Sequence, residues 1–599
     1  MNSVIPIETA KVIPDTLKIN SKRTFAIVDG GEVVTNSEQP AQSYSNQQVI
    51  FNITTVPNTV VDRKMFFNGV MQFTITCASV PGGTGTLLPV VVGANAPRAF
   101  PLSNIFQNIS MKINNNTITL PLNQLITAMQ RYNNISQKNN EFSLCPTYPD
   151  MSQNYSDLAF WTRNPLQCYG DSDYNEKRGA FPFTFTQVAS PTTNGPASFT
   201  ITMEITEEIQ MSPLLFGLDE GPGFCNVDTL NFTFNLDSNL QRVWSIDPSF
   251  YPAGAPGTGY GALSFSNFSW ASTPNLFLRV ITPKLLTVIP EAPVYNYYSL
   301  ETTTQDFPSV PAGSTINMPS QVVEFSSLPS KIYVFMRIQD QNITMSSTDT
   351  FFSLESLNVK FGNQQGVFSG TTKKELYNIA RKNGCNLSWE QWQGTINMPS
   401  VGQGATGSSY STTIGSVGSV FCFNTAVDMG LPTDVAPGVN GRYQFQLQTG
   451  SVFKNINTSL AIAPRLYIIG VQDGTLTLMR GNSINQIGVI TKQDILDAKE
   501  KPYDRSISIS QIRKYEGSSF FSVLKDINNY VKGNKLVSRG LNAVGSFVPE
   551  GYKQGVQKFE DIAKDLGYGL VAQRGGATVG GALVGGRKLT RAQMRNLMN

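Results

Sequence analysis

Apolar and polar side chains alternate along many short segments of this 599-residue chain, and this pattern restricts the fold more than any other feature. In residues 199–206, Phe, Ile, Met and Ile alternate with Thr, Thr, Glu and Thr. A period of two is typical of a β-strand with one buried and one solvated face. Similar segments lie at 48–53, 66–76, 230–236, 276–281, 443–447 and 466–471. Gly- and Pro-rich breaks separate them, so the sequence predicts an all-β protein.

One segment differs from the others because it is apolar on both faces. Residues 331–338 read Lys-Ile-Tyr-Val-Phe-Met-Arg-Ile, and Arg337 is the only charged residue inside the ends. A strand that is covered on both sides has this composition. We therefore expect residues 331–338 to form a central strand of a sheet.

The order of predicted elements occurs twice along the chain. Residues 108–113 and 356–361 are each followed by a short apolar run and then by a helical pattern. The helical patterns consist of Leu122, Leu125, Ile126 and Met129 in the first half and Leu376, Tyr377 and Ala380 in the second. Each half then ends in two strands, at 230–236 and 274–280 or at 443–447 and 464–471. Two copies of an eight-stranded sandwich, each with a short loop helix, explain this order.

The length of the chain also requires more than one hydrophobic core. Pro and Thr residues between 283 and 293 predict the boundary between the two halves. We expect an N-terminal arm at 1–39, a first jelly roll at 40–283, a second at 284–500 and a tail at 501–599. The predicted fold is thus two eight-stranded jelly-roll sandwiches side by side, with short loop helices and a helical, partly flexible C-terminal tail.

Histidine is absent from the chain. This excludes His-ligated metal sites and Ser-His-Asp or Cys-His nucleophiles. The six cysteines form no CxxC pair, which predicts buried free thiols in a reducing compartment. No apolar run reaches membrane-spanning length, and the first residues lack the apolar core of a secretory signal. We predict no catalytic, cofactor-binding or metal site.

Three acidic residues could form an acid/base cluster, namely Glu204, Glu207 and Glu208. The alternation places Glu204 and Glu208 on the polar face of a strand. We therefore interpret the cluster as a solvated strand face, because charged groups are exposed unless they are paired.

Aromatic residues gather in sequence at Tyr377, Trp389, Trp392 and Tyr410. They could form a platform on which a sugar stacks. We favour buried aromatic anchors between sheets or subunits, the more common role of Trp and Tyr.

The last hundred residues differ in charge and in hydrophobic period. Residues 501–599 contain 16 basic and 7 acidic residues, whereas the preceding body is mildly acidic. Amphipathic helices are predicted from Phe520, Phe521, Leu524, Ile527 and Val531 and from Val556, Phe559, Ile562 and Leu566. A glycine-rich run, 575–586, lacks the GK[ST] ending of a phosphate loop and is interpreted as a flexible linker. We rank docking on a scaffold or protein partner first, nucleic acid second and a membrane surface third.

Several turns and strand edges resemble the major capsid proteins of virophages, the small viruses that parasitise giant-virus factories, and more distantly those of polinton-like viruses. The resembling segments are 17–24 with Gly30 and Gly31, 99–105, Arg131-Tyr132, 362–370 before Leu376-Tyr377, and 473–476. Together they span roughly residues 17 to 498, and specificity comes from their number and order.

The resemblance implies a structural, non-enzymatic subunit of an icosahedral virion capsid around a double-stranded DNA genome, made in the host cytoplasm or viral factory. It implies a homotrimer that forms a pseudo-hexameric capsomer and then makes trimer–trimer contacts. A single jelly-roll penton protein, minor or cement proteins and a maturation protease are the further partners implied. Residues 583–587, Leu-Val-Gly-Gly-Arg, resemble the cleavage signal of adenovirus-type proteases, which predicts processing between Gly586 and Arg587. DNA contact by the tail is expected to be non-specific.

Two other classes of protein remain as alternatives. A carbohydrate-binding or adhesin protein built from sandwiches predicts a signal peptide or an exposed sugar pocket. A multidomain β-rich glycosidase predicts paired carboxylates that converge in a cleft.

Overall fold

A computed structural model describes residues 10–14, 24–28, 33–80, 95–132, 145–147, 149–151, 153, 183–187, 195–209, 223–248, 261–282, 291–399, 411–430 and 437–488. All of them lie in one compact unit, residues 1–497. The predicted tail and its cleavage site lie outside the described residues.

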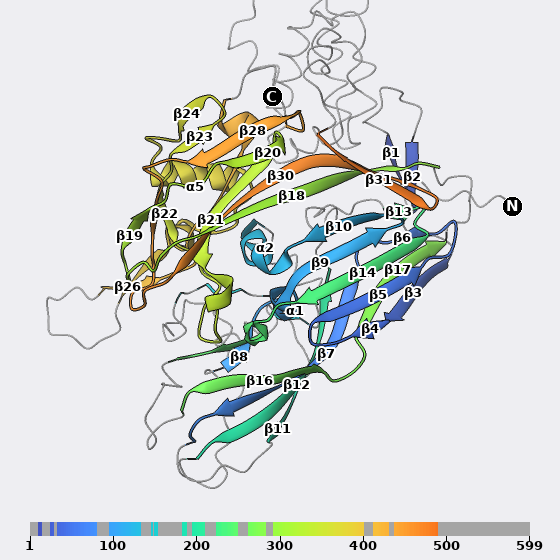
Figure 1. The fold of residues 1–599 in the computed structure, drawn as a ribbon, viewed down its shortest axis with the longest axis horizontal. Helices are drawn as coiled ribbons and strands as arrows, with labels where there is room; N and C mark the ends of the chain where they lie inside the picture. Colours follow the sequence, from blue (N-terminus) through green and yellow to red (C-terminus); the bar gives the residue numbers. More distant parts are fainter. Residues whose placement is uncertain are drawn as a thin grey trace, which may run out of the picture. The chain divides into compact units, whose positions relative to one another are not determined.

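The first half of the chain forms two antiparallel sheets (Figure 1). The larger has the order β11 (Phe183–Gln187), β12 (Ala197–Glu208), β7 (Phe66–Cys77), β17 (Asn275–Thr282), β6 (Val60–Val61) and β13 (Phe224–Cys225), with β16 (Leu263–Trp270) on β7 and β3 (Val33–Pro40) on β17. The smaller has the order β10 (Asn116–Leu120), β9 (Phe106–Ile113), β14 (Thr229–Leu236), β5 (Gln48–Thr54) and β4 (Ser43–Tyr44). Two short two-stranded sheets accompany them, β1 (Ala10–Pro14) with β2 (Thr24–Val28) and β8 (Asn95–Pro97) with β15 (Trp244–Ile246).

The inner faces of these sheets form the first core. Along β12 every second side chain is buried, as the alternation in the sequence predicts. Phenylalanine rings from both sheets meet in the core, and the Phe67 ring centroid lies 4.9 Å from Phe234 and 5.7 Å from Phe51. Edge-to-face packing of this kind adds to the free energy gained by burial.

The second half repeats the two-layer arrangement. One sheet has the order β18 (Val294–Asp306), β30 (Pro464–Met479), β21 (Lys331–Ile338) and β27 (Val420–Asn424), with β31 (Asn482–Ile487) on β30. The other layer contains β19 (Thr315–Asn317), β29 (Val452–Lys454) and β22 (Ser353–Ser356), and separately β20 (Val323–Ser327), β28 (Asn440–Leu447), β23 (Val359–Phe361) and β24 (Gln364–Val367). A hairpin of β25 (Thr395–Pro399) and β26 (Ser411–Gly415) lies beside them.

A hairpin followed by a helix occurs in both halves, which confirms the predicted repeat. Helix α2 (Leu122–Met129) follows β9–β10, and helix α5 (Lys373–Lys382) follows β23–β24. Helix α1 (Pro101–Ile105) precedes β9, whereas α6 (Trp389–Gln393) and α7 (Thr425–Asp428) lie in the second half. Reciprocal hydrogen bonds between Thr372 and Glu375 cap the start of α5.

Strand β21 confirms the prediction for residues 331–338. It lies between β30 and β27, and its six inner residues are buried. The repeated segment 356–361 falls on two strands, because β22 ends at Ser356 and β23 begins at Val359. Sequence reasoning also missed β18, where polar Asn, Ser and Thr residues obscure the alternation.

Candidate functional site: a buried charged joint between the two halves

The structure describes most, but not all, of the residues singled out from the sequence. Gly586, Arg587 and Tyr410 lie outside the described residues. Five cysteines are described, and all five are buried thiols outside any disulfide bond, as predicted. Among the described residues no group of three or more acidic or cysteine side chains could hold a metal ion. In the same part of the chain, no helix has the length and apolar composition needed to cross a membrane.

The interpretation of the glutamate cluster as a solvated strand face is wrong for Glu207. This side chain is 2% exposed and lies on the buried face of β12. Its carboxylate accepts hydrogen bonds from the backbone N–H groups of Leu102 (3.0 Å) and Ser103 (2.9 Å) and from the Ser103 hydroxyl. Glu204 is only partly buried and accepts a hydrogen bond from Asn68. The three glutamates therefore do not converge on one acid/base site.

The aromatic group proves to be an anchor at Trp392. Its indole is buried, and its N–H donates to the Val420 carbonyl at 3.2 Å. Tyr377 lies 5.6 Å from Trp392 and 5.4 Å from the half-buried Trp389. These rings pack α5 and α6 against β27. The interpretation as a buried aromatic anchor is confirmed for Trp392.

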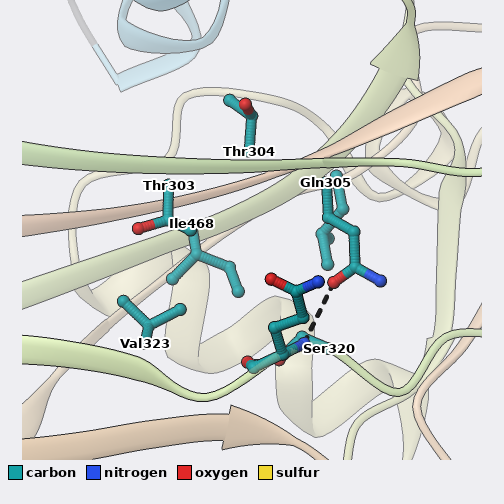
Figure 2. A pocket seen from close by; sticks show the side chains of 8 residues that line it. Thr303, Thr304, Gln305, Ser320, Val323 and Ile468 are labelled. Carbon is teal, nitrogen blue, oxygen red and sulfur yellow. Dashed lines mark hydrogen bonds between the residues drawn. The ribbon is translucent and has the colours of Figure 1, made fainter.

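A small hollow opens between β18 and the chain that leads into β20 (Figure 2). Gln305 accepts a hydrogen bond from the Gln321 backbone N–H at 3.0 Å across it, and Thr303, Val323 and Ile468 lie around it. Its volume of about 10 Å³ is roughly the room of one water molecule. The hollow is therefore too small for a sugar or another organic ligand.

A set of buried and partly buried arginines and aspartates forms a connected polar cluster among the described residues. It joins residues that are far apart in the sequence, and we call it the joint. Its members come from the first half (Arg98, Arg131, Asp150, Asp237 and Arg242) and from the second half (Arg337, Asp340, Asp349 and Arg465).

Arg98 forms the first part of the joint. Its guanidinium is fully buried and donates to the Asp349 carboxylate at 2.9 Å. The same group donates to the carbonyls of Ser347 (2.6 Å) and Thr344 (3.3 Å) and lies 3.8 Å from Asp150. One side chain of the first half thus holds the loop between β21 and β22 by several charge-assisted hydrogen bonds.

Arg131 connects the segment at Asp150 with the loop between β21 and β22 through their backbone carbonyls. It donates to the carbonyl oxygens of Asp150 (2.9 Å) and Asp349 (3.0 Å), and it lies over the ring of Phe351 at 5.8 Å. Burial lowers the pKa of Arg131 to about 10, although the carboxylates of Asp349 and Asp150 oppose this shift. The Asp150 carboxylate in turn accepts the backbone N–H of Asp349 at 2.9 Å.

Asp340 is the centre of the second part of the joint. Its carboxylate accepts hydrogen bonds from Arg337 (2.6 Å), Tyr467 (2.8 Å) and Arg465 (3.1 Å) and lies 3.6 Å from Arg242. Burial raises the pKa of Asp340, but Arg337, Arg242 and the Tyr467 hydrogen bond outweigh burial and hold it below the usual value. Asp340 therefore remains ionised in the interior.

Arg337 and Arg242, which surround Asp340, also contact helix α2 of the first half. Both donate to the carbonyl of Asn123, at 3.0 Å and 3.4 Å. Burial, together with the neighbouring Arg337, lowers the pKa of Arg242 to about 10. Of the whole joint, only Arg337 gave a signal in the sequence, because it interrupts an apolar strand.

Neutral contacts join the two halves at a separate place. The Asn114 side chain donates to the carbonyls of Met479 (3.0 Å) and Asn482 (3.1 Å), so the β9–β10 turn contacts the β30–β31 turn. The Tyr295 hydroxyl accepts the backbone N–H of Cys225 at 2.8 Å and donates to Gly223 at 3.0 Å. Breaking a buried ion pair by removing one partner costs several kcal/mol, so loss of the contacts between the halves is expected to be costly.

Two jelly-roll sandwiches with the same order of elements in one chain are the architecture of the double jelly-roll class of capsid proteins. Comparison with known proteins gives the same result. Residues 6–273 match the family model of the Sputnik virophage major capsid protein 1st domain, and residues 297–474 match that of the major capsid protein V20 C-terminal domain. A putative capsid protein V20 of Sputnik virophage is 31% identical over 617 aligned positions, which cover 99% of each chain.

Solved structures show the same fold. The cryo-EM structure of the Sputnik virophage matches with a TM-score of 0.68 and 28% identity, covering 88% of this chain and 99% of that one. The mavirus major capsid protein matches with a TM-score of 0.61 and 16% identity, covering 77% and 92%. The chain belongs to the virophage major capsid protein family, the structural proteins of the virion shell.

Proposed function

We propose that this chain self-assembles into homotrimers that act as pseudo-hexagonal capsomers of an icosahedral shell. Three chains contribute six sandwiches, and six similar lobes around a threefold axis give a nearly sixfold outline. Such a particle fits hexagonal positions, and contacts between trimers close the shell. The observation that carries the proposal is the joint, because a fixed arrangement of the two sandwiches keeps the outline constant from one trimer to the next.

The proposed domain division follows the sequence boundaries. Residues 40–283 form the first jelly roll, 284–500 the second and 501–599 a separate tail, with an arm at 1–39 whose last strand, β3, pairs with β17. In the described part of the chain from residue 33 onward, strand pairing stays within one half or the other, which supports this division.

The role of the chain is structural rather than enzymatic. The mature shell encloses a double-stranded DNA genome, and a single jelly-roll protein occupies its fivefold positions with minor or cement proteins between capsomers. A maturation protease cleaves the tail between Gly586 and Arg587, and before cleavage the basic tail contacts scaffold or DNA without sequence specificity.

Native mass spectrometry of the purified full-length protein tests the trimer. We expect a single species with three times the mass of the chain, because obligate assemblies bury more than roughly 2,000 Å². A monomer that persists at micromolar concentration would contradict the proposal. Mass spectrometry of mature particles tests the tail separately, since full-length chains that end at Asn599 would show that it is not processed.

A further inference from the structure

Glu207 is an acidic residue in the apolar core of the first sandwich. Its side chain lines a second small hollow, which Phe67, Phe106 and Phe234 line with it, together with aliphatic residues of β9 and α2. None of the ion pairs among the described residues includes it. A buried carboxylate without a cationic partner is costly in its ionised form.

Among the residues that the structure describes, few groups that can titrate lie around Glu207. Cys145 faces the carboxylate, with 3.8 Å between its sulfur and a carboxylate oxygen. Glu208 follows on β12 and lines the same small hollow, and Glu204 lies on the other face of the strand beside Asn68. Helix α1 offers only the Ser103 hydroxyl and backbone N–H groups. Hydrogen bonds and burial, rather than neighbouring charges, therefore set the properties of Glu207.

The segment that Glu207 holds continues directly into the joint. Asn104 donates to the carbonyls of Ala99 (2.7 Å, from its side chain) and Phe100 (3.0 Å, from its backbone), so hydrogen bonds link residues within 99–104. Arg98 directly precedes them in the chain, and we refer to the continuous segment 98–105 as one unit. Phe100 has a left-handed backbone with φ of 48°, a strained conformation that persists only where the surrounding structure holds it. Arg98, at the start of the unit, carries the ion pair with Asp349.

We propose that Glu207 is a proton-sensitive latch of the joint. In its neutral form it holds α1 against β12, and its ionisation favours an opened α1 that hydrates the carboxylate. Because Arg98 belongs to the same unit, opening of α1 also weakens the contact between Arg98 and Asp349. This inference concerns a single chain and does not depend on the proposed trimer.

The direction of the pH dependence follows from burial. Burial raises the pKa of Glu207 to about 7 from its ordinary 4.5, despite the hydrogen bonds from Ser103 and Leu102 that lower it. A group whose pKa is raised in the folded state stabilises that state at low pH, and this contribution is lost as the pH rises through the folded value. In the opened segment the ordinary pKa returns. Opening therefore becomes more populated as the pH rises from 4.5 to 7, by up to roughly tenfold per pH unit.

Hydrogen exchange of the full-length protein, followed by mass spectrometry, tests the latch. Between pH 5.5 and pH 8, after correction for the intrinsic exchange rate, we expect the opening constant of residues 98–105 to rise by roughly 10- to 100-fold. Residues 344–351 should follow with the same sign, because Arg98 donates to three groups there.

Two variants separate the latch from general effects of pH. Glu207→Gln removes the ionisable group, so the pH dependence of opening should disappear even where the variant is less stable. Glu204→Gln, on the outer face of the same strand, should retain the dependence of the wild type. Equal opening of the wild-type segment at both pH values overturns the proposal, as does a pH dependence that persists in Glu207→Gln. Opening of 98–105 without any change in 344–351 overturns its coupling to the joint.

Discussion

Replacing Asp349 by Ala removes the carboxylate that accepts the Arg98 hydrogen bond at 2.9 Å. The Arg98 guanidinium has no exposed surface and cannot regain hydration without opening the structure. Loss of one partner of a buried pair costs about 3–5 kcal/mol of the free energy of unfolding. Because Asp150 remains 3.8 Å from Arg98, we expect a value near the lower end, about 3 kcal/mol.

Equilibrium unfolding in urea measures this loss, at one fixed protein concentration because association also stabilises the folded state. The double variant Arg98→Met with Asp349→Leu should be less destabilised than the sum of its single substitutions, by about 2 kcal/mol. The matched control is Glu324→Ala, which breaks a surface ion pair between Glu324 (side chain 39% exposed) and Arg442 (77% exposed). A loss for Asp349→Ala no larger than for this control, or strict additivity in the double variant, would refute the reasoning.

Three further predictions follow from individual contacts. Gly418 has φ of +89°, and a Cβ there would overlap the Phe351 carbonyl oxygen, so Gly418→Ala should lower the free energy of unfolding by more than about 3 kcal/mol, measured by urea titration. Trp392→Ala should cost about 3–5 kcal/mol in the same assay, because the variant loses both a buried ring and its hydrogen bond. Asp340 has its pKa held below the usual value by Arg337, so its contribution to stability is present above the ordinary carboxylate range and lost as the pH falls through its folded value. Thermal unfolding followed from pH 6 down to pH 3 should therefore show less acid destabilisation in Asp340→Asn, which is already destabilised at pH 6, than in the wild type.

The strands of the core could be predicted because burial of one sheet face leaves a local period in the sequence. That period held along β12, where Phe199, Ile201, Met203 and Ile205 are all buried. Glu207 continues the same odd-numbered series, so the signal for its burial was present. The general rule that charged groups are exposed outweighed it, since the hydrogen-bond donors of α1 lie more than a hundred residues earlier in the chain.

The joint could not be predicted from local pattern for a different reason. Arg98 and Asp349 are 251 residues apart, and each lies outside the regular strands. An isolated arginine or aspartate in a loop has no period that reveals a buried partner. Only Arg337 interrupts an otherwise apolar strand, which is a signal that the sequence shows. In the structure it donates a hydrogen bond to Asp340.

Negative-stain electron microscopy of the purified full-length protein tests the proposed capsomer most directly. The account predicts particles with a hexagonal outline and threefold symmetry, in which six similar lobes come from three chains. Single chains with two lobes, or closed particles with another symmetry, would contradict the claim that this protein builds pseudo-hexagonal trimers.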